Sequence, residues 1–168
     1  MGQILLLEKY SKFFRKFNLK IAQFLLTSRE LREKESLENI KNTYNRVKNH
    51  AITIVNENDV VSIKELSFGD NDGLAKELMI ALDFDTLVFL TKKGQLIRNG
   101  KKLTKTKFYQ EKDYDNLKVE TGGSGGLKSK LDCAKFLTSH NRKVFLGKCS
   151  DGLLNIISDK NKRTEFLR

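Results

Sequence analysis

The chain has 168 residues and a mass of 19.3 kDa; 39% of the residues are apolar, 32% are charged, and the mean hydropathy is −0.47. No apolar run approaches the ~18 residues of a membrane-spanning helix. Eleven Phe and four Tyr argue against a disordered chain. The 32 cations exceed the 21 carboxylates by eleven. Such a surface attracts anions, namely nucleotides, nucleic acid or acidic metabolites; the alternative, which the charge count alone favours, is a Lys-rich and Asn-rich composition spread over a solvated surface. The length predicts a single domain over residues 1–168.

Cysteine and histidine are too scarce for a metal centre of the usual kind. Cys133 and Cys149 form no C-x-x-C pattern, and His50 and His140 are the only imidazoles. We therefore expect reduced thiols and no metal site built by the protein. The N-terminus lacks the layout of a signal peptide, which predicts a cytoplasmic location without membrane attachment.

Strand and helix patterns alternate along the chain. Short apolar or alternating runs predict strands, four of them buried, at residues 19–27, 51–55, 61–66, 85–91 and 143–147. Apolar side chains at helical spacing predict helices at residues 3–17, 27–49, 73–82, 127–137 and 153–157. This alternation predicts an α/β domain with a mainly parallel sheet.

Local signals refine these elements. Thr27 and Glu30 have the spacing of a capping box that opens the long second helix. Turn signals at Lys93-Gly94 and Asn99-Gly100 predict a hairpin within residues 92–107, which carry seven cations and no carboxylate. The residues after the last short helix read as a polar tail.

Polar clusters follow the predicted strands, at the edge where parallel sheets bind ligands. They are Asn56 to Asp59, Asp70 to Asp72 before a helix, Thr91-Lys92, and Gly147-Lys148. A structural alternative exists for two of them, because Asp72 could cap a helix that begins at Gly73 and Asn58 could close a turn.

The stretch Gly122 to Gly126 is a glycine-rich loop that leads into a helix. Glycines let backbone N–H groups approach phosphate oxygens, and the following helix points its positive end at them. Lys130, one turn into the helix, could reach back to a transferring phosphate. The loop matches neither of the two common phosphate-binding patterns, so a flexible turn is the alternative. Together with the acid and amide loops, it predicts a phosphoryl-transfer cleft for a nucleotide and an amino-acid-like acceptor.

Four motifs carry a resemblance to a known family. They are VNENDVVS (55–62), SFGDNDGLA (67–75), LVFLT (87–91) and GGSGGLKSKLDCA (122–134). With them the chain resembles the amino-acid kinase family, and within it the glutamate 5-kinase branch, over nearly its whole length.

The resemblance implies a three-layer αβα fold with a mainly parallel sheet, and transfer of the ATP γ-phosphate, with Mg²⁺, to the side-chain carboxylate of L-glutamate on the way to proline. Lys130 would be the catalytic residue. The substrate-binding residues would be Asp59 and Asn71, with Asn56, Asp70 and Asp72. The nucleotide-binding residues would be Thr91, Lys92, Gly123, Ser124, Gly125, Gly126, Leu127, Lys128, Ser129 and Lys130.

The chain also departs from the family pattern. By the resemblance we expect the chain to lack the N-terminal third of the kinase domain and a C-terminal RNA-binding-like module, and Lys92 stands where the family has Asp. We expect the chain to be inactive alone, to need a separately encoded N-terminal portion, and to form a homo-oligomer. The alternatives are a non-catalytic remnant of the kinase, or a basic module whose residues 92–107 bind nucleic acid, which the scarcity of stacking aromatic residues disfavours.

Overall fold

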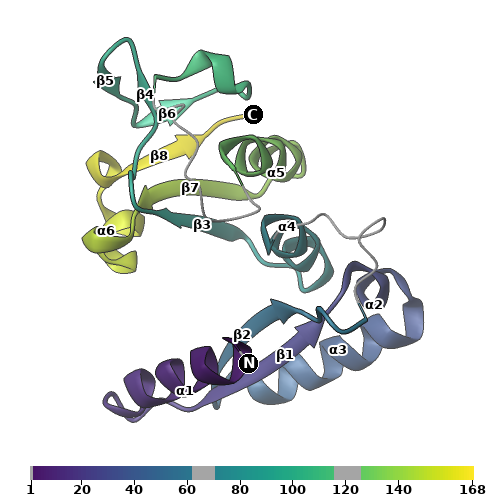
Figure 1. Cartoon of the computed structure of the whole chain (residues 1–168). Helices are drawn as coiled ribbons and strands as arrows, with labels where there is room; N and C mark the ends of the chain where they lie inside the picture. The colour runs from purple at the N-terminus through teal and green to yellow at the C-terminus, as the bar shows by residue number, and fades with distance from the viewer. Residues whose placement is uncertain (1, 62–70, 116–125) are drawn as a thin grey trace. The chain divides into compact units, whose positions relative to one another are not determined.

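The computed structural model describes residues 2–61, 71–115 and 126–168, which form two compact units. Unit 1 spans Met1–Ser67 and unit 2 spans Phe68–Arg168. Both units combine helices with parallel strand pairs, so the predicted α/β class is confirmed (Figure 1). The strand predicted at 61–66 lies, apart from Val61, outside the described residues. The single domain predicted for residues 1–168 stays a prediction.

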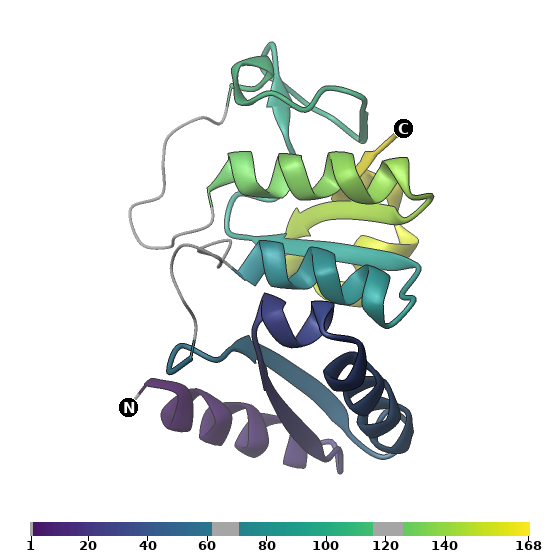
Figure 2. The same cartoon turned by 90° about the vertical axis from the view of Figure 1, so that its right-hand side faces the viewer.

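Unit 1 is a two-stranded parallel sheet between helices. Its elements are α1 (Gly2–Arg15), β1 (Ile21–Leu26), α2 (Ser28–Arg32), α3 (Lys34–Val47) and β2 (Ile52–Glu57). The strands pair in register from Ile21 with Ile52 to Leu26 with Glu57. Helix α1 lies over one face of the sheet and α3 over the other (Figure 2).

The strands of unit 1 are less buried than their sequences predict. In β1 only Leu26 is buried, and Leu25 is 41% exposed; β2 has no buried residue. The prediction of buried strands was wrong here because a sheet of two strands leaves both edges open and is only partly covered by α1 and α3. Strand β2 also continues to Glu57, so Asn56 belongs to the strand and not to the loop that follows.

The capping box at the start of α2 is confirmed. The Thr27 side chain accepts a hydrogen bond from the Arg29 amide, and the Thr27 amide donates to Glu30 Oε2 over 2.7 Å. The predicted single helix is divided, however, because Glu33 has extended backbone angles of φ −78° and ψ 124°. Helix α3 begins afresh at Lys34 and buries Ile40.

Unit 2 contains a four-stranded sheet in the order β3-β7-β8-β6. Its helices are α4 (Asn71–Ala81), η1 (Glu111–Asp113), α5 (Leu127–Ser139), η2 (Cys149–Asp151), α6 (Leu153–Ser158) and η3 (Lys160–Lys162). Its strands are β3 (Thr86–Thr91), β4 (Ile97–Arg98), β5 (Lys101–Lys102), β6 (Lys105–Thr106), β7 (Lys143–Lys148) and β8 (Arg163–Phe166). The pairs β3–β7 and β6–β8 are parallel, whereas β7–β8 is antiparallel.

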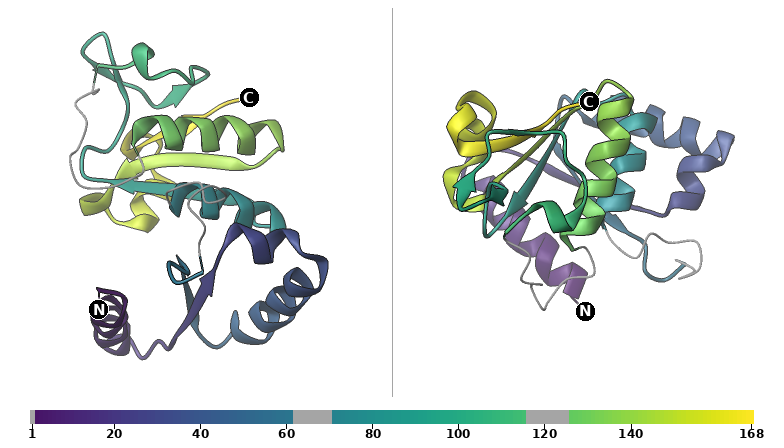
Figure 3. Two further views of the ribbon diagram at one scale, coloured as in Figure 1. Left: turned by 45° about the vertical axis from the view of Figure 1, so that its right-hand side comes forward. Right: turned by 90° about the horizontal axis from the view of Figure 1, so that it is seen from above.

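The sheet of unit 2 lies between two helical layers, as the three-layer prediction requires (Figure 3). On one face, Val144 and Leu146 of β7 share a buried cluster with Leu131 and Leu137 of α5. On the other face Gly147 lies against Ile156 of α6, where an added Cβ would be 2.7 Å from the Ile156 side chain. Because successive side chains of β7 point to opposite faces of the sheet, Val144 and Leu146 face α5 whereas Gly147 faces α6.

The C-terminal segment is a strand and not the polar tail that its sequence suggests. Arg163, Thr164 and Phe166 of β8 are buried. The Arg163 guanidinium donates to the carbonyls of Ile156 and Ile157 and lies 3.9 Å from the Phe145 ring centroid. Polar side chains are stable inside the sheet because they are hydrogen-bonded there.

The predicted hairpin turn is also confirmed. Asn99 and Gly100 join β4 to β5 with φ of 51° and 72°, the positive values of a type I′ turn. Cys133 is buried and Cys149 is exposed, and no disulfide joins them. None of the helices in the described parts of the chain has the length and apolar character of a membrane span.

The capping box yields a prediction on pH dependence. Burial raises the pKa of Glu30, but hydrogen bonds from the side chain and amide of Thr27, together with the Glu30 amide and the Arg29 charge, outweigh it, so the pKa falls below its ordinary 4.5. A lowered folded-state pKa stabilises the fold above the unfolded pKa, and this contribution is lost as the pH falls through the folded value. We expect Glu30→Gln to lower the free energy of unfolding by about 1 kcal/mol at pH 7 and by less at pH 3.5, measured by urea denaturation. Glu38→Gln, at an exposed site on α3, is the control, and a Glu30→Gln effect that is equal at both pH values would contradict the prediction.

Candidate active site

An ion pair joins the first turns of α4 and α5. Lys130 Nζ lies 2.8 Å from Asp72 Oδ2, and the two side chains are 18% and 15% exposed. Asp72 is the second residue of α4 and Lys130 the fourth of α5, and the two helices pack against each other. The structure thus brings together two of the three sequence stretches that the cleft prediction combined.

The Lys130 ammonium also lies above β3. Its Nζ is 5.8 Å from the ring centroid of Phe89, a β3 residue that is only 5% exposed. Phe89 and Thr91 point to the same face of the sheet because side chains alternate along a strand. The ammonium is therefore held near the carboxyl end of β3, where ligands of parallel sheets bind.

A carboxylate caps the N-terminus of α5. Gly126 is the N-cap residue and offers no side chain, so the first amides of the helix need other acceptors. The Lys128 amide donates to Glu111 Oε1 over 3.0 Å. Sequence reasoning missed Glu111 because its helix begins 16 residues away and no local pattern links the two segments. The hydrogen bond from the Lys128 amide to Glu111 shows that the α5 N-terminus attracts an anion, as a helix dipole predicts.

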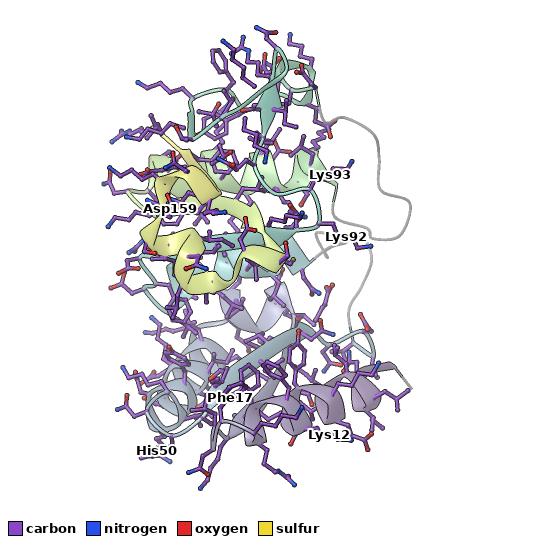
Figure 4. The ribbon with its side chains drawn as sticks, turned by 90° about the vertical axis from the view of Figure 1, so that its left-hand side faces the viewer. Lys12, Phe17, His50, Lys92, Lys93 and Asp159 are labelled. Atoms are coloured by element: carbon purple, nitrogen blue, oxygen red, sulfur yellow. The ribbon has the colours of Figure 1, made fainter. Side chains whose placement is uncertain are left out.

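Three lysines lie at the carboxyl edge of β3 and β7. Thr91 of β3 pairs with Lys148 of β7, and Lys92 and Lys93 follow Thr91 directly. All three lysines are exposed, and Lys92 and Lys93 point away from the ribbon in Figure 4. The turn is closed by the Gly94 amide, which donates to Thr91 Oγ1 over 2.9 Å.

The acid and amide loop of unit 1 follows β2. Gln3 Nε2 donates to the Glu57 carbonyl and to Asp59 Oδ2, each over 3.3 Å. The Asn58 amide donates to the Leu26 carbonyl, and Asn58 Oδ1 accepts from the Val60 amide. The turn-closing role predicted as the structural alternative for Asn58 is therefore confirmed, and α1 tethers the loop through Gln3.

The remaining predicted site residues divide into three sets. Asn56 and Asp59 belong to unit 1; Asn71, Asp72, Thr91, Lys92, Gly126, Leu127, Lys128, Ser129 and Lys130 belong to unit 2; and Asp70, Gly123, Ser124 and Gly125 lie outside the described residues. Helix α4 begins at Asn71, so Asp72 lies inside the helix and the alternative that it caps a helix starting at Gly73 was wrong. Within the described residues, no three His, Cys, Asp or Glu side chains are grouped to hold a metal ion.

The aromatic residues beside the basic hairpin are engaged within the protein. The Arg98 guanidinium lies 3.8 Å from the Phe108 ring centroid. The Tyr109 hydroxyl bonds to Thr138 and to the Leu167 carbonyl, and its ring stacks on Phe166 at 6.0 Å. Burial raises the pKa of Tyr109. These contacts leave Tyr109 a structural role and weigh against base stacking at the hairpin.

The sequence profile of the amino acid kinase family matches residues 1–148, so the chain belongs to this family. Among the relatives that it matches is the glutamate 5-kinase of Bacillus cereus, at 34% identity over 176 aligned positions; the match covers 98% of this chain and 48% of that protein. The glutamate 5-kinase 2 of Bacillus licheniformis is 34% identical, with coverage of 92% and 44%. The glutamate 5-kinase of Bacillus anthracis is 36% identical, with coverage of 88% and 43%. The chain thus spans about half the length of these curated relatives.

Gly94 gives a stability prediction at the β3 turn. Both Gly94 and Gly100 have positive φ, of 81° and 72°, but an added Cβ at Gly94 would lie 2.9 Å from Lys148 Cβ, whereas at Gly100 it meets nothing within 4 Å. We expect Gly94→Ala to lower the free energy of unfolding by about 2 kcal/mol or more, and Gly100→Ala by only about 1 kcal/mol, in urea denaturation. Equal losses for the two variants would contradict the packing at this edge.

Proposed function

We propose that the chain is part of a glutamate 5-kinase and takes part in ATP-dependent phosphorylation of the side-chain carboxylate of L-glutamate, as a step of proline biosynthesis. The observation that carries the proposal is the Lys130–Asp72 ion pair, which sets an ammonium at the edge of the sheet inside the matched region. The names of the relatives supply the substrate.

The reaction depends on cations that stabilise developing negative charge, and it requires no covalent intermediate with the enzyme. The bond between the γ-phosphorus and its bridging oxygen breaks while a carboxylate oxygen of glutamate bonds to the phosphorus, and negative charge spreads over the phosphoryl oxygens. Lys130 would stabilise that charge, and Asp72 would hold the Lys130 ammonium in one position. Mg²⁺ would supply further positive charge to the phosphates, and it commonly needs only one or two carboxylates besides them.

The other predicted residues divide between the two substrates. Asp59 and Asn71, with Asn56, Asp70 and Asp72, would bind the ammonium and α-carboxylate of glutamate. Thr91, Lys92 and residues 123–130 would bind ATP, with the α5 N-terminus facing its phosphates. Asp59 stands beside Gln3, whose amide would orient its carboxylate. At position 92 ATP would face the positively charged side chain of a lysine.

We also propose partners and a cellular location for the kinase. A separately encoded N-terminal portion of the kinase domain would complete the cleft, the assembly would be a homo-oligomer, and the reaction would take place in the cytoplasm. We expect little activity from the 168-residue chain alone.

The test is acyl-phosphate trapping. The chain is incubated with ATP, Mg²⁺ and glutamate in the presence of hydroxylamine, with and without the part of the Bacillus cereus kinase that the match leaves uncovered. We expect hydroxamate only in the completed mixture, because half a cleft cannot position both substrates. Lys130→Ala should lower the rate about 10²-fold or more in that mixture.

The control variant is Lys135→Ala, an exposed lysine on the same helix, which should keep the rate of the unaltered chain. Hydroxamate from the chain alone would overturn the need for a completing portion. Absence of hydroxamate in both mixtures, with no ATP-induced rise in melting temperature, would favour a non-catalytic remnant. Salt-sensitive binding to an oligonucleotide without such a rise would favour the basic module instead.

A further inference from the structure

Three exposed lysines meet where β3 and β7 end, and we call them the lysine cluster. Lys92 and Lys93 follow the last residue of β3 (Figure 4), and Lys148 is the last residue of β7. Thr91 pairs with Lys148 in the parallel register, so the chain leaves β3 directly beside the third lysine. Neighbouring strands are only about 4.8 Å apart, so the three side chains start from one small area of the surface.

The turn that carries the first two lysines is packed against the third. The Gly94 amide closes the turn by donating to Thr91 Oγ1 over 2.9 Å, and Gly94 is buried. Gly94 approaches Lys148 so closely that an added Cβ would lie 2.9 Å from Lys148 Cβ and 3.4 Å from its backbone nitrogen. A side chain at position 94 would push the turn away from β7, so the glycine keeps the three lysines together.

The third lysine lies on the face of the sheet that Lys130 covers. Leu146 and Lys148 share one face of β7 because side chains alternate along a strand, and Leu146 packs in the buried cluster with Leu131 of α5. The Lys130 ammonium is 5.8 Å from the ring centroid of Phe89, which pairs with Leu146. Lys148 is therefore on the same face, about 7 Å further along the strand towards the carboxyl edge.

The segments that carry the cluster are poor in carboxylates. Residues 92–107 contain none, and the first carboxylate after Lys148 is Asp151. The ion pairs that join described residues include neither Lys92 nor Lys148. Like charges that start so close together repel each other, and an anion with several charges relieves this repulsion when it binds them together.

We propose that the lysine cluster binds the linked phosphates of an oligophosphate, either the triphosphate of a nucleotide or an inorganic one. Such an anion concentrates several negative charges in a short length, which matches three ammonium groups that start from one turn and the adjoining strand end. With a nucleotide as its natural ligand, the cluster would add Lys93 and Lys148 to the site of the proposed function, on which that assignment rests. Binding of the phosphates requires neither glutamate nor a completing portion of the kinase.

A compact oligophosphate suits the cluster better than a nucleic-acid strand does. Proteins that bind single strands combine positive charge with aromatic rings on which the bases stack. The Arg98 guanidinium covers the Phe108 ring, 3.8 Å from its centroid. The Tyr109 ring stacks on Phe166 at 6.0 Å. These rings are engaged within the protein, which favours a ligand whose binding depends on phosphate charge alone.

Isothermal titration calorimetry of the full chain with inorganic tripolyphosphate, in the presence of EDTA, tests the proposal. We expect Lys148→Gln and Lys92→Gln each to raise the dissociation constant about 10-fold, because each variant removes a charge-assisted contact. The matched control is Lys101→Gln, which removes one exposed cation from the same basic hairpin. It should change the constant by less than about 2-fold, because salt screens a charge that does not touch the ligand.

The melting temperature separates a loss of binding from a loss of folding. Without ligand, Lys148→Gln should raise the melting temperature at low salt, since it removes repulsion from the other two lysines. Tripolyphosphate should then raise the melting temperature of this variant less than that of the wild type. A wild-type chain that does not bind tripolyphosphate at about 1 mM would overturn the proposal, as would a control variant that loses as much affinity as Lys148→Gln.

Titrations with ATP and with a single-stranded oligonucleotide identify the ligand. Equal affinities for ATP and tripolyphosphate would support an inorganic ligand, and tighter binding of ATP would support a nucleotide. An oligonucleotide that binds more tightly than either, and that Lys148→Gln and Lys92→Gln release, would assign the cluster to nucleic acid and contradict the proposal. Because no turnover is measured, a negative result here leaves the hydroxamate test of the kinase activity open, and absence of hydroxamate leaves the lysine cluster intact.

Discussion

Lys130 and Asp72 have both lost most of their contact with water, and each is stable there because the other lies 2.8 Å away. Removing either one would strand the other as an unpaired charge between α4 and α5. The pair therefore fixes how the first turns of these two helices meet. Its position over Phe89 ties both helices to the carboxyl end of β3.

The pair is electrically close to neutral, so anion binding at this edge depends on what surrounds it. Lys92 and Lys148 are exposed, and the ion pairs among the described residues include neither of them. The N-terminus of α5 adds the positive end of a helix dipole. Glu111 acts in the opposite direction, because its carboxylate accepts the Lys128 amide that a phosphate would also seek. A phosphate that bound the Lys128 amide would therefore have to displace that carboxylate.

The sequence was sufficient for the elements whose signals are local. The Thr27–Glu30 cap and the Asn99-Gly100 turn depend on neighbours within a few residues, and both were predicted correctly. Strand β8 was missed because Arg163 and its neighbours are buried by partners far along the chain, such as the Leu103 carbonyl that accepts from Thr164. The same reason explains the Lys130–Asp72 bond: both residues were predicted for the site, but 58 positions separate them and no periodic pattern pairs them.

A double-mutant cycle on Asp72 and Lys130 tests the central claim most directly. The free energy of unfolding is measured in urea for the wild type, Asp72→Asn, Lys130→Met and the double variant. If the two side chains are bonded as described, the stability lost by the double variant will be smaller, by about 1 kcal/mol or more, than the sum of the losses of the two single variants. Additive losses would show that the side chains do not interact, and the description of the site would then be wrong.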